Sequence, residues 1–358
     1  MFENTKRTEI SELGEFGLIK HLTENISLQN ASSILGIGDD AAIFQHKGNQ
    51  SLITKDLLVE GVHFDLTYVP LKHLGYKAAM VNFSDIVAMQ GKPEQMLVGM
   101  GVSNRFSVEA IEEIFQGFNY ACTKMKVDLI GGDTVSSQKG LILSITALGS
   151  IKKDKSVLRS TAQAGDLIFV SGDLGAAYMG LLVLEREKKT FISNPKHQPD
   201  LAGYDYIIGR QLKPEARIDI IELLKKKKVK PTSMIDISDG LASELKHICT
   251  SSNKACSIYE DKIPIDPVTV TAAEEFRINP VTAALNGGED YELLFTISPN
   301  DFEKLKDEKS VHVIGHITEN GNVMSLINNL GEQIPLEAQG WDAFDKKQNS
   351  NNQEDKLQ

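Results

Sequence analysis

The 358-residue sequence lacks several features that would place a protein in a class at once. Its three cysteines, Cys122, Cys249 and Cys256, are an odd number without Cys-x-x-Cys spacing, so no disulfide framework is indicated. No apolar run approaches the roughly 20 residues that span a bilayer, and residues 1–12 do not resemble a signal peptide. These absences predict a cytoplasmic protein with reduced thiols and no membrane partner.

Positive charge is also scarce, because 38 Lys and Arg residues stand against 49 Asp and Glu residues, giving a formal net charge of −11. This sign argues against a broad nucleic-acid-binding face, so nucleic acid is not an expected partner. The lysine run 225–228 is better explained as a solvated helix C-terminus. The sequence also has no Gly-x-x-x-x-Gly-Lys-Ser/Thr loop and no protein-kinase catalytic signature, so an ordinary P-loop or protein-kinase fold is not indicated.

The length exceeds what one hydrophobic core usually accommodates, so two α/β domains are expected. In the first domain, residues 1–151, apolar periodicity predicts roughly four strands with two helices on one face. The strands are expected near 52–54, 95–103, 127–130 and 141–148, and the helices at 71–89 and 107–126. Polar residues 152–163 are interpreted as the junction between the domains.

The second domain, residues 152–344, is expected to alternate strands and helices in the same way. Its strands are predicted at 166–170, 234–237, 256–259, 291–297, 311–316 and 322–327, and its helices at 176–186, from 214 to the lysine run, and 241–249. Residues 187–201 read as an exposed loop, and the polar tail 345–358 as disordered.

The most informative feature that is present is a set of aspartates placed where strands are expected to end. These acids occur in the segments 36–40 (Gly-Ile-Gly-Asp-Asp), 54–56 (Thr-Lys-Asp), 130–134 (Ile-Gly-Gly-Asp-Thr) and 236–240 (Asp-Ile-Ser-Asp-Gly). Two glycines before an aspartate would let a phosphate approach the backbone while the acid reaches a cation. Oxygen ligands without a histidine or cysteine cluster suit Mg²⁺ and disfavour zinc, although any single turn of this kind commonly serves only geometry.

Asp85 is the most informative single residue, because it is an acid in a helix that is otherwise apolar nearly all round. An isolated buried carboxylate there would be costly unless it is paired or bound to a metal. The alternative, an aspartate within the helix that caps a neighbouring loop, stays open.

Two further segments suggest a ligand pocket. Residues 286–292 form a diglycine–acid turn just before a strand, and a pocket-lining loop is favoured over a tight hairpin. His63, in the segment 59–64, could contact a phosphate, although a lone histidine is more often an incidental surface or core residue.

Together these segments resemble the thiamine-monophosphate kinase family, of the superfamily that includes aminoimidazole ribonucleotide synthetase and selenophosphate synthetase. The resemblance runs from about Gly14 to Trp341 and rests on the order and spacing of 36–40, 59–64, 82–85, 129–134, 235–240 and 287–292. It implies a two-domain aminoimidazole ribonucleotide synthetase-like α/β fold, whose N-terminal domain binds ATP and magnesium and pairs its sheet in a homodimer.

The resemblance also implies roles for the matching positions. Several magnesium ions would be held by Asp40, Thr54, Asp56, Asp85, Asp133, Asp236 and Asp239. Among these acids, Asp85, Asp133 and Asp236 are expected to carry the catalysis. The contacts to ATP would come from Gly132, Asp133, Arg159 and Ser238. Lys55 stands at a metal-binding position where the family usually has a second hydroxyl, which leaves the number of ions open.

Thiamine phosphate would be held by His63, Glu289 and Trp341. An indole face attracts a cationic thiazolium ring, which gives the Trp341 assignment a physical basis.

In the implied reaction, ATP and thiamine phosphate give thiamine diphosphate and ADP by direct in-line transfer. A phosphate monoester has a second pKa of about 6 and is mostly dianionic at neutral pH, so no strong base is needed. Magnesium would offset the repulsion between the two anions.

The alternatives are another ATP-dependent member of the superfamily, such as aminoimidazole ribonucleotide synthetase, or a non-catalytic protein that binds nucleotide or divalent cations. The N-terminal cysteine typical of selenophosphate synthetase and the C-terminal cysteine of the hydrogenase-maturation relative are both missing.

Overall fold

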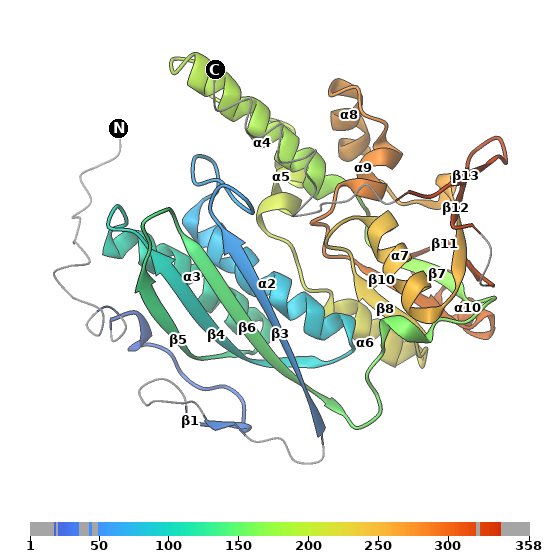
Figure 1. Cartoon of the computed structure of the whole chain (residues 1–358), viewed down its shortest axis with the longest axis horizontal. Coiled ribbons are helices and arrows are strands. Elements are labelled where there is room, and N and C mark those ends of the chain that lie inside the picture. The colour runs from blue at the N-terminus through green and yellow to red at the C-terminus, as the bar shows by residue number, and fades with distance from the viewer. Residues whose placement is uncertain (1–17, 19–20, 36–42, 45–48, 320–322, 338–358) are drawn as a thin grey trace.

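The structure is a computed structural model that describes residues 18, 21–35, 43–44, 49–319 and 323–337. Two α/β units lie side by side, and the N-terminal sheet faces the viewer in Figure 1 with its helices behind it. Asp40, Trp341 and the tail 345–358 lie outside the described residues. Every helix in the described ranges is too short or too polar to traverse a lipid bilayer.

The N-terminal sheet contains β3 (Asn49–Val59), β6 (Ile142–Lys152), β4 (Lys92–Val102) and β5 (Asp128–Ser136), in that order. β4 and β5 run parallel, whereas the other neighbours are antiparallel. The short strands β1 (Ser33–Leu35) and β2 (Ile43–Phe44) pair separately. The predicted four strands and two helices are therefore present, but β3 and β5 extend well beyond their predicted ends.

The helices α2 (Leu71–Ala88) and α3 (Val108–Met125) cover one face of this sheet. Ser107 caps α3 as its sequence predicts, since its side chain accepts a hydrogen bond from the Ala110 amide. The two helices approach closely through glycines: a Cβ on Gly75 would lie 2.0 Å from the Ile114 carbonyl oxygen. This tight contact fixes the position of α2, which carries the central site residues.

The second sheet has the order β13-β12-β9-β11-β7-β10-β8. Its strands are β7 (Leu167–Ser171), β8 (Ser233–Asp236), β9 (Ala255–Tyr259), β10 (Leu293–Ile297), β11 (Val311–Thr318), β12 (Ser325–Ile327) and β13 (Gln333–Pro335). The helices are α4 (Ala176–Ser193), α5 (Asp205–Leu212), α6 (Ile218–Lys227), α7 (Leu241–Ser252), α8 (Pro267–Glu275), α9 (Pro280–Asn286) and α10 (Phe302–Leu305). The 3₁₀ turns are η1 (Arg159–Thr161), η2 (Glu260–Lys262) and η3 (Pro299–Asp301).

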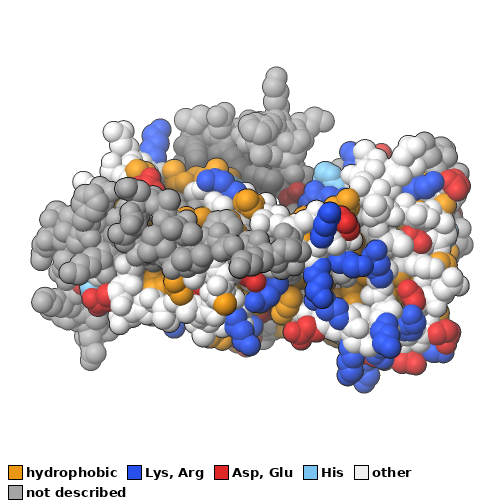
Figure 2. All heavy atoms as spheres, turned by 90° about the horizontal axis from the view of Figure 1, so that it is seen from below, with side chains coloured by type: hydrophobic (Ala, Val, Ile, Leu, Met, Phe, Trp, Pro, Cys, Tyr) orange, Lys and Arg blue, Asp and Glu red, His pale blue; other side chains and the backbone are white. Residues whose placement is uncertain are grey.

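One predicted loop is partly wrong, because α4 continues to Ser193 and takes in the first half of 187–201. The reason is Glu187, which is buried against the returning chain and accepts a hydrogen bond from the Asp200 amide at 3.0 Å. At the end of α6, Lys225, Lys226 and Lys228 are exposed, as expected for a solvated helix C-terminus, whereas Lys227 is half-buried and pairs with Glu308. Figure 2 shows basic and acidic side chains mixed on this part of the surface rather than a purely basic patch.

Candidate active site

The side chains of β3 alternate across the sheet, and this alternation divides the segment 54–56. Thr54 faces α2 and donates its hydroxyl to Asp85 Oδ2 at 2.6 Å, while the Asp56 amide donates to Asn82 Oδ1 at 3.1 Å. Lys55, between them, is exposed on the opposite face of the sheet. The prediction that this segment closes a strand is wrong, because β3 continues to Val59 in register with β6.

A hydrogen bond between Ser84 and Asp236 joins the two domains next to Asp85. Asp236 ends β8 and is only 3 % exposed, and Ser84 of α2 donates its hydroxyl to Asp236 Oδ2 at 2.6 Å. Burial, followed by the charge of Asp85, raises the pKa of Asp236 to about 7. Burial also raises the pKa of Asp85, although the Thr54 hydrogen bond and the charge of Arg159 act in the opposite direction.

We call Asp56, Asp85 and Asp236 the carboxylate cluster, because the charge of Asp85 acts on both of the others. Burial, and then the charge of Asp85, raises the pKa of Asp56 to about 6. Within the described ranges, no lysine or arginine forms an ion pair with any of the three. The cluster is therefore an uncompensated concentration of negative charge, which is costly unless a cation binds there.

Arg159 is a source of positive charge that acts on this cluster. It begins η1, and its carbonyl oxygen accepts hydrogen bonds from Ser233 and Ser252, both at 3.0 Å. Arg159 is exposed, and its charge opposes the rise in the pKa of Asp85, Asp236 and Asp239 without reversing it. An exposed cation at the edge of the carboxylates is suited to contact an incoming phosphate.

The segment 236–240 continues the site from β8 toward α7. Glu244 of α7, which is 1 % exposed, accepts hydrogen bonds from the Asp239 amide at 3.0 Å and the Ser238 hydroxyl at 3.3 Å. Burial raises the pKa of Glu244 to about 8 and also raises that of Asp239. Glu244 therefore supports the backbone that presents Ser238 and Asp239.

Glu289 and His63, both predicted to hold substrate, approach one another across the domain boundary. Lys77 of α2 donates to Glu289 Oε2 at 3.0 Å, and Gln211 of α5 donates to the same oxygen at 2.7 Å. Desolvation lowers the pKa of His63. The negative charge of Glu289 opposes this change, and the positive charge of Lys77 adds to it. His63 Nδ1 accepts the Val59 amide at 3.0 Å.

Lys77 was missed by the sequence reasoning, although its side chain is only 6 % exposed. The available signal was a lysine in a helix that is apolar nearly all round, which is the same signal that marked Asp85. Its ammonium also donates to the Gln211 carbonyl at 3.0 Å, so it joins α2 to α5.

Asp290 and Glu292 follow Glu289 but hold the loop instead of lining the site. The Asp290 carboxylate accepts the Gly175 amide at 2.8 Å and the Ala177 amide at 3.3 Å, which satisfies the start of α4. Glu292 is 1 % exposed and forms ion pairs with Arg210 at 2.7 Å and with Arg217. The contacts of Asp290 and the ion pairs of Glu292 therefore hold the loop in place on the C-terminal side of Glu289.

Asp133 and Gly132 do not join the cluster within one chain. Both lie inside β5, where Asp133 is paired with Gly99, so the predicted strand end at the two glycines is wrong. A Cβ on Gly132 would lie 1.9 Å from the Val98 carbonyl oxygen, so strand packing explains this glycine. Asp133 is exposed, and β5 lies three strand spacings from β3, roughly 14 Å away.

The oxygen donors of the site fit magnesium when other ligands complete its shell. Among the described residues, no three His, Cys, Asp or Glu side chains converge closely enough to hold an ion alone. Paired carboxylates and the Thr54 hydroxyl supply hard oxygen ligands, and Mg²⁺ commonly completes its shell with water and substrate phosphates. The residues present therefore fit a magnesium–phosphate complex better than a metal bound by protein alone.

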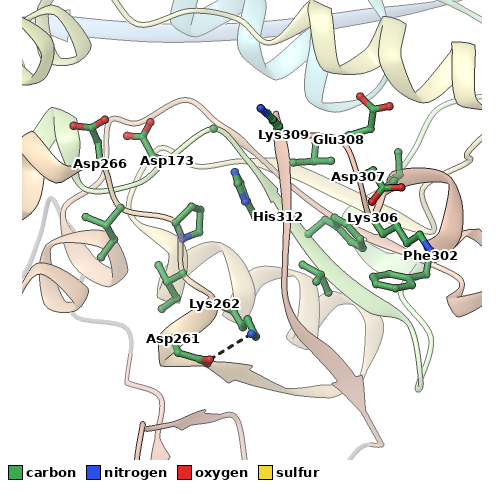
Figure 3. A pocket seen from close by; sticks show the side chains of 18 of the residues that line it. Asp173, Asp261, Lys262, Asp266, Phe302, Lys306, Asp307, Glu308, Lys309 and His312 are labelled. Carbon is green, nitrogen blue, oxygen red and sulfur yellow. Dashed lines mark ion pairs between the residues drawn. The ribbon is translucent and has the colours of Figure 1, made fainter.

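A cavity of about 800 Å³ in the C-terminal domain lies away from these residues. Figure 3 shows Asp173 and Asp266 on one side of it, with His312 and the segment 306–309 facing them. None of the predicted site residues lines this cavity. The candidate site is instead the carboxylate cluster between the domains.

The two halves of the chain match family models for the AIR synthase related proteins. The N-terminal domain model matches residues 38–151, and the C-terminal domain model matches residues 163–327. The fold and the acidic site between the domains thus define a two-domain AIR synthase related protein, as predicted.

Thiamine-monophosphate kinase of Bacillus subtilis (strain 168) is 35 % identical over 338 residues, which cover 93 % of this chain and 100 % of that protein. The crystal structure of thiamine-monophosphate kinase from Stenotrophomonas maltophilia K279a superposes with a TM-score of 0.75 at 31 % identity, covering 90 % of this chain and 98 % of that one. A structure of AaThiL complexed with AMPPCP and TMP gives a TM-score of 0.71 at 31 % identity, covering 96 % and 100 %. The chain belongs to the thiamine-monophosphate kinase family.

Proposed function

We propose that this chain transfers the terminal phosphoryl group of ATP to thiamine phosphate, giving thiamine diphosphate and ADP. The observation that carries the proposal is the cluster of Asp56, Asp85 and Asp236, which gathers uncompensated carboxylates from both domains. A relative of the same fold binds AMPPCP, an ATP analogue, together with TMP. A site built to gather cations between two phosphorylated ligands suits transfer between them.

The cluster would hold magnesium through Asp56, Asp85 and Asp236, with Thr54 and Asp239 beside them. When bound, magnesium ions neutralise the carboxylates and the phosphates that must meet. The chain fixes its ligands in advance: the Thr54 hydroxyl orients Asp85, and the Ser84 hydroxyl orients Asp236. Preorganised ligands reduce the rearrangement that the reaction requires.

Arg159 and Ser238 would contact ATP at the edge of the cluster. The support is the charge of Arg159 acting on three aspartates and the position of Ser238 two residues after Asp236. His63 and Glu289, held by the Val59 amide and by Lys77, would bind thiamine phosphate. The carboxylate of Glu289 suits the cationic thiamine, and Trp341 is proposed to cover the thiazolium ring.

The proposed homodimer would form through the face of the N-terminal sheet that α2 and α3 leave open. Three large apolar side chains on this face are exposed, Ile53 by 66 %, Leu57 by 53 % and Val135 by 56 %. Such a patch on a sheet favours a self-complementary contact with a second copy. Lys55 and Asp133 also lie on this face, so any part they play in metal or ATP binding would require the dimer.

The proposed domains are residues 1–151 and 152–344. Helix α2 belongs to the first domain and contacts the second through Ser84 and Lys77. The chain is also proposed to act in the cytoplasm, with several magnesium ions per site.

The test is an assay of the purified chain with ATP and Mg²⁺, with and without thiamine phosphate. We expect ADP and thiamine diphosphate in equal amounts, and no ADP above background when unphosphorylated thiamine replaces thiamine phosphate. A protein that binds ATP but releases no ADP with thiamine phosphate would be a non-catalytic binder, and the proposal would be wrong.

A further inference from the structure

The side chain of Glu289 is held by two donors that meet on one of its oxygens. Lys77 of α2 and Gln211 of α5 donate to Glu289 Oε2 at 3.0 and 2.7 Å. Glu289 Oε1 has no hydrogen bond to any residue in the described ranges, and 30 % of the side chain is exposed. Because the two donors occupy Oε2, Oε1 is the oxygen that is left for a ligand.

The backbone of Glu289 is fixed as well. Its φ is 59°, in the left-handed region that residues other than glycine seldom adopt. Its amide donates to the Ser238 carbonyl at 2.6 Å, which bonds the loop to the segment that carries Asp236 and Asp239. A Cβ on Gly288 would lie 2.6 Å from the same carbonyl oxygen, so the loop can pass this closely only with a glycine there. Backbone conformations of this kind gather at functional sites.

Gln211 makes its contact while leaving its own oxygen unpaired. The residue is 6 % exposed, and its Oε1 is buried without a hydrogen-bond partner in the part of the chain that the structure describes. A buried acceptor of this kind destabilises a fold. Turning the amide over would not remove the problem, because Oε1 would then face the Glu289 carboxylate and neither oxygen carries a proton. The unpaired oxygen is therefore a consequence of directing the N–H group at Glu289.

Lys77 and Gln211 contribute differently to this contact. The Lys77 ammonium supplies the opposite charge, and it also donates to the Gln211 carbonyl at 3.0 Å, so the three residues form one unit across the two domains. An ammonium on a flexible chain of four carbons balances a carboxylate but does not set its direction. The planar amide of Gln211, fixed in a buried position, is the group that sets the direction of Glu289.

We propose that Gln211 is a positioning residue for thiamine phosphate, because its amide turns Glu289 so that Oε1 faces the cationic part of this substrate. The inference rests on the proposed function, in which Glu289 binds thiamine phosphate. A carboxylate already held toward a cation binds it more tightly than one that must first be ordered. Because Gln211 acts through Glu289, its effect falls on the binding of thiamine phosphate and not on that of ATP.

The test compares the parent with Gln211→Met, which keeps the length of the side chain and removes the amide. We expect KM for thiamine phosphate to rise about tenfold, as for the loss of one hydrogen bond to a charged group, with kcat and KM for ATP little changed. The midpoint of thermal unfolding should not fall, because the variant no longer buries an unpaired oxygen. Gln211→Leu repeats the test with a second apolar side chain, so that the result does not depend on the folding of one variant.

Two further variants separate positioning from a general structural role. Tyr206→Phe is the matched control on α5, because it removes a hydrogen bond to Asp173 and should leave KM for thiamine phosphate unchanged. Glu289→Ala removes the group that Gln211 positions. In that background Gln211→Met should raise KM for thiamine phosphate no further, since two residues that act through one contact are not additive.

Three results would overturn the inference while leaving the proposed function in place. The first is an unchanged KM for thiamine phosphate in folded Gln211→Met. The second is a lower unfolding midpoint with KM rising equally for thiamine phosphate and ATP, which is the pattern of a structural residue. The third is a tenfold rise that persists in the Glu289→Ala background. A parent without thiamine phosphate-dependent ADP release would instead refute the proposed function, and this inference with it.

Discussion

Asp236→Asn is expected to stabilise the metal-free protein while abolishing its activity. Asp236 is 3 % exposed, and its pKa is about 7 in the folded chain against an ordinary value of 3.8. Below the lower pKa the carboxyl is protonated in both the folded and the unfolded chain and does not affect the free energy of unfolding. As the pH rises from the lower pKa to the higher, the unfolded chain has released this proton and the folded chain still holds it, so the free energy of unfolding falls. Once the pH has passed through the higher pKa, the loss is complete.

The size of this effect follows from the two pKa values. At 1.36 kcal/mol per pH unit, the ionised carboxyl opposes folding by about 4 kcal/mol at most above neutral pH. Asparagine has no charge and its side-chain oxygen can still accept the Ser84 hydroxyl, but its amide group needs a new partner. We therefore expect a net gain of roughly 2 kcal/mol at about pH 8, which turns into a loss of roughly 2 kcal/mol at about pH 4, where only the cost of the amide remains.

The assay is denaturant unfolding in the presence of a chelator, over a series of pH values. Asp166→Asn is the matched control, because Asp166 is also buried but accepts the Gln163 amide at 2.8 Å and the Thr232 hydroxyl at 2.6 Å. That variant should lose stability. Added Mg²⁺ with ATP should stabilise the parent more than Asp236→Asn. A variant no more stable than the parent at about pH 8, or a gain independent of pH, would refute the reasoning.

Three further changes test other parts of the site. Asp85→Asn should lower kcat by at least about 100-fold in a folded protein, measured over a Mg²⁺ titration, because it removes an anionic ligand with little change of shape; near-normal turnover at limiting Mg²⁺ would contradict this. Lys77→Met should raise KM for thiamine phosphate about tenfold and leave KM for ATP little changed, since it releases Glu289; equal effects on both would show a general loss of structure. Leu57→Asp should convert the dimer to monomer in light scattering, whereas Ile192→Asp, on α4 and exposed by 65 % against 53 % for Leu57, should not; a monomeric parent would rule out the dimer.

The helices around the site were predictable because their apolar periodicity is strong. Helix α3 spans Val108–Met125, which agrees with the predicted range 107–126. The apolar surface of α2 correctly marked Asp85 as a carboxylate that needs a partner, and the Thr54 hydroxyl is that partner. Local pattern was sufficient in these cases, because the same residues decide both helix formation and burial.

The extents of the strands were less predictable, because strand pairing overrides local turn signals. Gly131 and Gly132 read as a strand end, yet pairing with β4 continues through both to Ser136. The direction of the Lys55 side chain cannot be predicted from the sequence, since only the register of β3 decides which face it takes.

The assembly of the site could not be worked out from spacing alone, because its contacts join positions far apart in the chain. The bond between Ser84 and Asp236 spans 152 residues, and that between Lys77 and Glu289 spans 212. The acidic turns and the resemblance together supplied the aspartates and Glu289, but neither supplied Lys77.

The most direct test of the central claim is the release of ADP from ATP by the purified protein with Mg²⁺, with thiamine phosphate as the only variable. The account predicts that ADP appears only when thiamine phosphate is present, and that one thiamine diphosphate forms for each ADP. ADP release at the same rate without thiamine phosphate, or its absence in both samples, would contradict the claim that this site transfers a phosphoryl group to thiamine phosphate.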